Sequence, residues 1–152
     1  LTNADGSVKD EVVQAYIGNK LLPGTPPTKY LYDAYAHDSD LELKNMQRDI
    51  DEVVVYGKIP SHSICIPTIA SSNYSPDFMY VVKKGDGTKE LNIVIETKAY
   101  DKETQITPDE ETKISCAEEF FKAMTANGYT VHFRKQINSK DVLTIVNDLI
   151  NE

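Results

Sequence analysis

The chain has 152 residues, of which 24 are acidic and 16 basic, and its net charge at pH 7 is −8. This length suits one domain with a single hydrophobic core, and a hydrophobic content of 40% excludes an intrinsically disordered chain. The acidic balance argues against a protein that binds nucleic acid unaided, and no apolar run reaches the roughly 18 residues of a membrane-spanning helix.

The first residue is Leu1 rather than Met, and no signal peptide is visible, so we expect a fragment of a longer, cytoplasmic protein. The two cysteines, Cys65 and Cys116, do not form a disulfide framework and are expected to be reduced packing residues. The three histidines are scattered and none pairs with a cysteine at ligand spacing, which argues against a zinc site.

The chain divides at about residue 37. Residues 7–17 carry an apolar stripe at helical spacing, and the proline-rich stretch 21–27 is expected to lack regular structure. The tyrosine-rich segment 30–36 fits a short helix or an irregular packing segment equally well. We therefore expect residues 1–37 to be a helical and linker segment and residues 38–152 to be the principal domain.

A firmer helix is predicted over residues 40–51. Its apolar residues are spaced 3, 4 and 3 apart and are Leu43, Met46, Ile50 and Val53. Ser39 and Glu42 fit a capping box at its start. Glu42 is also placed to point from this helix toward the sheet as an extra acidic group of a site, and both interpretations stay open.

Strands are predicted over residues 53–59 and 78–82 and again over residues 91–95, with an extended run at 63–67 and a polar loop at 70–74. The last two strands are joined by a Gly-Asp-Gly turn at residues 85–87, which is typical of a hairpin.

Antiparallel pairing in that hairpin places the start of its first strand beside the end of its second. Asp77 and Glu96 should therefore meet at one edge of the sheet, and Lys98, two residues on, should face the same side. Two carboxylates beside a lysine suit Mg²⁺, which prefers oxygen ligands. The alternative is ordinary turn chemistry at Asp77 and an exposed ion pair between Glu96 and Lys98.

The remaining residues predict a helix from Pro108 to Gly128, a strand over 129–134 and a last helix capped by Ser139. Residues 129–140 carry Arg134, Lys135 and Lys140 without any acid. A strand reached through a helix is expected to be parallel to the hairpin, so we predict an α/β fold with a mixed central sheet flanked by helices.

Several segments together resemble a known family. The order Pro76-Asp77, an 18-residue spacer and Glu96-Thr97-Lys98 resembles the signature of PD-(D/E)xK nucleases, with Glu42 in the position of their leading helix. Additional segments resemble the C-terminal endonuclease domain of the Res subunit of Type III restriction enzymes; they are Lys58-Ile59-Pro60, Ile66-Pro67-Thr68, Asn73-Tyr74-Ser75 and residues 111–117. Ala99 departs from this branch, which often has glycine after the lysine.

The resemblance implies a restriction-endonuclease-like core and a Mg²⁺-dependent endonuclease that hydrolyses double-stranded DNA, with Mn²⁺ as a substitute metal. It implies that Asp77, Glu96 and the backbone carbonyl of Thr97 are metal ligands, that Lys98 positions the attacking water, and that Glu42 completes the acidic cluster.

The family's full protein carries a helicase-like ATPase motor and works with a methyltransferase subunit. This chain has no GxxxxGK(S/T) phosphate loop, so ATP would serve only the motor. Because the chain is acidic, we expect other parts of the parent protein to supply most of the DNA affinity. The alternatives are another nuclease of the same superfamily, acting in repair or on junctions, and a non-catalytic docking domain with the same fold.

Overall fold

The computed structural model describes residues 18–69, 72–85 and 90–152. The helix predicted over residues 7–17 and two of the three residues of the predicted hairpin turn lie outside this part of the chain. No helix within these ranges is long and apolar enough to cross a membrane.

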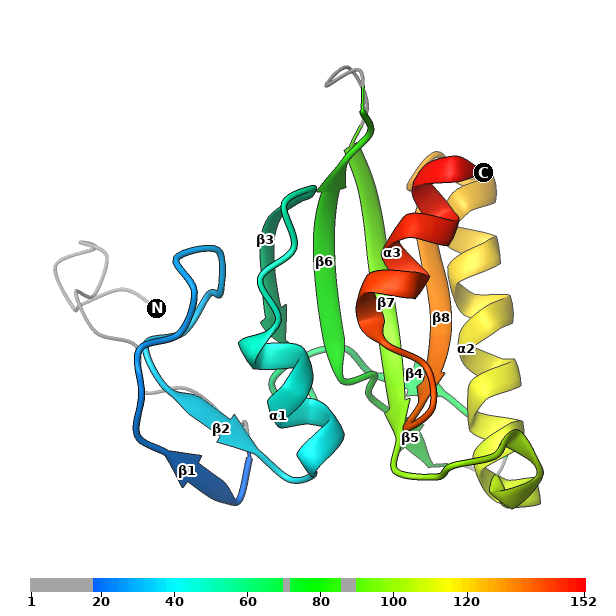
Figure 1. Ribbon diagram of the computed structural model, residues 1–152. Coiled ribbons are helices and arrows are strands. Elements are labelled where there is room, and N and C mark those ends of the chain that lie inside the picture. Colours follow the sequence, from blue (N-terminus) through cyan, green and yellow to red (C-terminus); the bar gives the residue numbers. More distant parts are fainter. Residues whose placement is uncertain (1–17, 70–71, 86–89) are drawn as a thin grey trace, which may run out of the picture.

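A four-stranded mixed sheet forms the centre of the structure (Figure 1). Its strands are β3 (Val53–Lys58), β6 (Phe78–Lys83), β7 (Glu90–Lys98) and β8 (Val131–Ile137), in the spatial order β3-β6-β7-β8. The first two pairings are antiparallel and the pairing of β7 with β8 is parallel. The predicted α/β fold with a mixed sheet is therefore confirmed, including the parallel strand that follows a helical crossover.

Two small antiparallel pairs lie outside the main sheet. One joins β1 (Lys20–Leu22) to β2 (Tyr35–His37), so the segment left open in the sequence ends in a strand rather than a helix. The other joins β4 (Ile66–Pro67) to β5 (Asn73–Tyr74), which lies where a polar loop was predicted. Cys65, directly before β4, is exposed, so its prediction as a packing residue is wrong.

The helices are α1 (Asp40–Gln47), the short 3-10 helix η1 (Glu103–Gln105), α2 (Pro108–Ala126) and α3 (Val142–Asn151). Helix α1 is shorter than predicted because its C-cap, Arg48, already has extended backbone angles (φ −78°, ψ 108°). The helical spacing of apolar residues predicted a longer helix because it included Val53, which belongs to the following strand β3. Helix α3 is capped by Asp141 and not by the predicted Ser139, because the Asp141 side chain accepts a hydrogen bond from the backbone N–H of Leu143.

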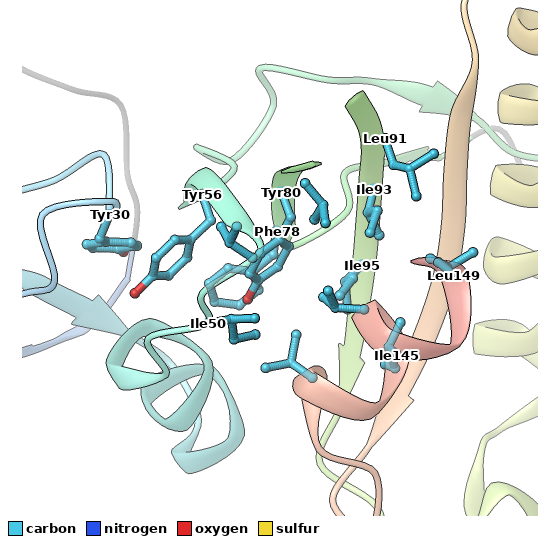
Figure 2. Packing of buried hydrophobic residues seen from close by; sticks show 14 of the residues in the cluster. Tyr30, Ile50, Tyr56, Phe78, Tyr80, Leu91, Ile93, Ile95, Ile145 and Leu149 are labelled. Carbon is cyan, nitrogen blue, oxygen red and sulfur yellow. The ribbon is translucent and has the colours of Figure 1, made fainter. Parts of the chain in front are cut away.

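Each face of the sheet has its own hydrophobic core. Alternate residues of β6 and β7, such as Tyr80 and Ile95, pack against α1 and α3 (Figure 2). The opposite face, with Val94 and Phe133, packs against α2. Full burial of such a side chain contributes roughly 1.5–3 kcal/mol, so the two cores hold strand register firmly.

The segment before α1 packs against the first of these cores. Tyr30 forms an isolated bridge with Tyr56, and Tyr30 and Tyr35 are both buried there. The Tyr56 hydroxyl in turn donates a hydrogen bond of 2.6 Å to the Met46 carbonyl in α1. The division of the chain at residue 37 stays a prediction, but residues on both sides of it share this core.

The register of β6 and β7 determines which residues lie opposite each other at the lower end of these two strands in Figure 1. Phe78 is paired with Ile95, so the residues just beyond them, Asp77 and Glu96, lie opposite each other. Because side chains alternate along a strand and Val94 faces α2, Glu96 and Lys98 face α2 as well.

Candidate functional site

Asp77 is fixed by three hydrogen bonds to β7. Its backbone N–H donates to the Ile95 carbonyl at 3.2 Å. Its Oδ2 accepts from the backbone N–H of Thr97 at 2.7 Å and from the Thr97 hydroxyl at 2.6 Å. Thr97 therefore orients the Asp77 carboxylate, and the two strands hold it beside Glu96.

Lys98 joins the carboxylate of its own strand to helix α2. Its Nζ lies 2.8 Å from Glu96 Oε1 and 3.5 Å from Glu110 Oε1. Glu110 is fixed by the capping box of α2, in which Thr107 is the reciprocal partner, and it also accepts a hydrogen bond from the Tyr100 hydroxyl at 3.2 Å. The ammonium group is thus held at one place above the sheet edge.

A third carboxylate approaches from α1. Ser39 caps this helix by accepting from the Glu42 N–H, as predicted, but the Glu42 side chain does not return the bond to Ser39. Its Oε2 instead accepts from the Asp38 N–H at 2.7 Å and from Lys58 Nζ at 2.8 Å. Lys58 also lies 2.9 Å from Asp38, so a single buried ammonium holds two acids of the α1 start.

These groups line one hollow of about 300 Å³ between the starts of α1 and α2, with Asp77, Glu96, Thr97 and Lys98 on its sheet side and Glu42 and Glu110 on its helix sides. The sequence-predicted residues are therefore brought together. Sequence reasoning missed two others, Glu110 and Lys58. No role was assigned to Glu110 from the sequence, and Lys58 was named only within a segment that resembles the endonuclease domain.

Burial makes Asp77 and Glu96 hard to ionise. The pKa of Glu96 is raised to about 7, first by burial and then by the Asp77 charge, while Lys98 opposes the change. Burial also raises the pKa of Asp77, against the two hydrogen bonds from Thr97. Two neighbouring buried carboxylates are unfavourable when both are charged, and a cation bound between them would stabilise their charged forms.

One oxygen of the site is buried without a hydrogen-bond donor. Glu96 Oε2 has no partner among the described residues, and neither has the buried hydroxyl of Tyr74. The Glu96 charge is nevertheless close enough to raise the pKa of Tyr74, with burial as the larger cause. Buried polar atoms are rarely left unpaired, so Glu96 Oε2 is placed to accept from the neighbouring Tyr74 hydroxyl or to bind an added cation.

The donor set fits Mg²⁺ better than a transition metal. Across the described ranges, no group of three or more His, Cys, Asp or Glu side chains is placed to hold a metal ion together. Mg²⁺ usually keeps several waters and takes only one or two carboxylates, with substrate phosphate as a further ligand. Asp77 and Glu96 supply the one or two carboxylates that such an ion takes.

Comparison with known proteins identifies the family. The family model described as an endonuclease domain matches residues 28–140, which is most of the chain. The chain belongs to this family of endonuclease domains.

The relatives are much longer proteins. The chain is 37% identical over 147 residues to the Type III restriction-modification enzyme EcoPI Res subunit of Escherichia phage P1, which covers 95% of this chain and 15% of that protein. The EcoP15I Res subunit of Escherichia coli gives the same identity and coverage. The StyLTI Res subunit of Salmonella typhimurium is 26% identical over 82% of the chain and 12% of its own length. No solved structure matches the chain.

The raised pKa of Glu96 predicts a pH-dependent stability without metal. Between the ordinary value of 4.5 and about 7, the folded chain binds more protons than the unfolded chain, so rising pH destabilises the fold through this residue. The side chain at position 96 cannot ionise in Glu96→Gln, so this variant does not lose stability through that group as pH rises. The variant should therefore gain on the wild type as pH rises from 4.5 to 7, by about 3 kcal/mol at about 1.4 kcal/mol per pKa unit.

Urea unfolding of both proteins in EDTA across this pH range measures the difference. A difference that stays constant over the range would show that Glu96 ionises at its ordinary pKa.

The buried ammonium of Lys58 predicts a large loss of stability on its removal. Lys58→Met would leave Glu42 buried without its cation, and breaking a buried pair in this way costs about 3–5 kcal/mol. The matched control is Lys122→Met, whose pair with Glu119 is exposed on both sides. The control should cost at most about 1 kcal/mol in chemical unfolding. Equal costs for the two variants would mean that Lys58 does not hold the α1 start.

Proposed function

We propose that the chain is the metal-dependent DNA-cleaving domain of a Type III restriction enzyme Res subunit. The observation that carries the proposal is the pairing of Asp77 and Glu96 across β6 and β7, with the Lys98 ammonium 2.8 Å from Glu96. Family membership and the similarity to three Res subunits support the same assignment.

The reaction is hydrolysis of a phosphodiester bond in double-stranded DNA. The oxygen of a water molecule attacks phosphorus, the bond from phosphorus to the 3′ oxygen breaks, and a proton completes the 3′-hydroxyl, leaving a 5′-phosphate. Asp77, Glu96 and the Thr97 carbonyl would hold Mg²⁺, or Mn²⁺ in its place. When bound, the metal makes a water molecule more acidic and offsets charge on the phosphate.

The protein's own groups have separate tasks in this proposal. Lys98 donates hydrogen bonds to the attacking water or to a phosphate oxygen, where it stabilises developing negative charge. Glu110 and Glu96 hold that ammonium from two sides, which restricts its position before DNA arrives. Glu42, neutralised by Lys58, closes the α1 side of the hollow and completes the acidic cluster.

The chain spans about 15% of the length of the first two relatives, so most of a whole Res protein lies outside it. We propose that a helicase-like ATPase in the same subunit and a methyltransferase subunit deliver this domain to DNA. ATP would act only at that motor. Site-directed cleavage and a cytoplasmic location belong to the same proposal.

The proposal predicts that a divalent ion stabilises the isolated chain through two particular residues. Mn²⁺ or Mg²⁺ should raise the melting temperature of the wild type, because a ligand that binds only the folded state stabilises it by about 2.7 kcal/mol at 100 times its Kd. Asp77→Asn and Glu96→Gln should lose this rise, whereas Lys98→Met should keep it.

Thermal unfolding with millimolar metal measures the effect. A wild type without any rise would favour the alternative of a docking domain whose acidic site is inactive.

The proposal also predicts how substitutions at the site change DNA cleavage by the protein that carries this domain, assembled with its partner subunit. Asp77→Asn, Glu96→Gln and Lys98→Met should each reduce DNA cleavage by at least about 100-fold, the usual cost of losing one group that stabilises the transition state. Lys122→Met, on the exposed surface of α2, is the control and should cleave normally. Normal cleavage by any of the three site variants would exclude the role proposed for that residue.

A further inference from the structure

A second polar hollow lies next to the proposed cleavage site. It has a volume of about 420 Å³ and lies between α1 and the turn from β8 to α3. Its lining includes three exposed cations, Lys44, Arg48 and Lys140, and four amide side chains, which are Asn45, Gln47, Gln136 and Asn138. We call this set the basic groove.

Charge distinguishes the basic groove from the rest of the protein. The chain as a whole carries a net charge of −8, yet the groove has three cations and a single acid, Asp141. Arg48 lies 3.6 Å from Asp141 and Lys140 lies 3.5 Å from Asp148. These pairs are exposed and such pairs contribute little, so phosphate oxygens can replace the carboxylates at small cost.

The floor of the groove is rigid. Asn45 Nδ2 donates to Gln136 Oε1 at 2.6 Å, and Gln136 Nε2 donates back to Asn45 Oδ1 at 3.1 Å. Both side chains are almost completely buried, at 2% and 1% exposure. Gln136 Nε2 also donates to the Lys140 carbonyl at 2.9 Å, which fixes the turn that carries one of the cations.

The groove is continuous with the proposed cleavage site in three places. Gln136 is paired in register with Thr97, which lines the cleavage hollow. The Asn138 N–H donates to the Tyr100 carbonyl at 2.8 Å, next to Lys98. On α1, Glu42 lines the cleavage hollow and Asn45, one turn later, lines the groove.

The dimensions match a nucleic-acid strand. The two cations on α1, Lys44 and Arg48, are about 6 Å apart along the helix at a rise of 1.5 Å per residue. Neighbouring phosphates of one strand are separated by a comparable distance, so these cations can each contact one of two successive phosphates. Amide and hydroxyl groups beside cations are the usual partners of phosphate and sugar oxygens.

We infer that the basic groove binds the sugar-phosphate backbone of the DNA strand next to the phosphate that is cleaved. The inference rests on the proposed function and names the surface through which this acidic domain contacts its substrate. It assigns the cations Lys44, Arg48 and Lys140 to phosphate positioning, with no part in base recognition.

Another basic hollow, around Lys122, Arg134 and Lys135, is a weaker choice. Its lining shares Lys140 with the groove, but it carries two acids, Glu103 and Glu118, where the groove carries one. Lys135 is paired in register with Glu96, so this hollow also reaches the cleavage site. Its other end, at Lys122, lies about 18 Å along α2 from Glu110.

Titration of the ¹⁵N-labelled chain with a short DNA duplex tests the inference. The experiment is done in EDTA at low salt, so that the DNA is not cleaved and weak binding is detected. We expect the amide shifts of residues 44–48 and 136–141 to change most. Changes centred on residues 131–135 and 118–122, or no changes at millimolar duplex, would overturn the inference.

A pair of charge-matched variants gives the second measurement. The triple variant Lys44→Glu, Arg48→Glu and Lys140→Glu should bind DNA at least about tenfold more weakly and show a shallower salt dependence, because up to three phosphate contacts are lost. The control, Lys20→Glu, Lys83→Glu and Lys113→Glu, changes the net charge equally on surfaces outside both basic hollows. Equal weakening in both would show that only overall charge matters, and the neutral Lys44→Ala, Arg48→Ala and Lys140→Ala variant checks that added acids do not cause the loss.

The metal-dependent rise in melting temperature separates this inference from the proposed function. The groove variant should keep the rise that Mn²⁺ produces in the wild type. If the wild type binds DNA through the groove but shows no response to metal, the cleavage assignment fails and the groove stands. If the wild type responds to metal but the groove shifts are absent, the groove inference fails and the cleavage assignment stands.

Discussion

The structure depends on one alignment of backbone atoms, the antiparallel register of β6 and β7. It pairs Phe78 with Ile95 and so places Asp77 opposite Glu96 on the α2 side of the sheet. A slip of one residue would turn either side chain to the other face. Such a slip is opposed by the core, because Phe78, Tyr80, Ile93 and Ile95 are each at most 1% exposed. The same hydrophobic contacts that stabilise the fold therefore determine the geometry of the acidic site.

The charges at the sheet edge form two compensated groups rather than one acidic cluster. Lys58 neutralises Glu42 and Asp38 on the α1 side, and Lys98 lies between Glu96 and Glu110 on the α2 side. Asp77 lies between these groups and depends on hydrogen bonds from Thr97 instead of a lysine. Burial raises the pKa of both Asp77 and Glu96, and the Asp77 charge also raises that of Glu96, so the place between them is where an added cation gains most.

The sequence predicted the parts of this site that depend on local patterns. Alternation and the hairpin signal were enough to bring Asp77, Glu96 and Lys98 to one edge, and a helical crossover was enough to predict the parallel strand β8. It could not predict partners that depend on tertiary distance. Lys58 and Glu42 are 16 residues apart, and Asn45 and Gln136 are 91 residues apart, so neither pair leaves a local signal. The end of α1 was also misplaced, because Val53 continued a helical spacing that the strand had taken over.

The acids of the hollow and the cations of the basic groove lie in different places, which explains how an acidic domain can act on DNA, a polyanion. The carboxylates of the hollow lie where a cation is needed, and Glu42, Glu96 and Glu110 are paired there with Lys58 or Lys98. The cations of the basic groove are paired only with exposed acids, so they remain available at the surface. Repulsion between the net charge of −8 and DNA acts over about 8–10 Å in physiological salt, whereas groove contacts are direct. In the function we propose, such a domain binds DNA weakly by itself, and other parts of the parent protein hold the DNA close to it.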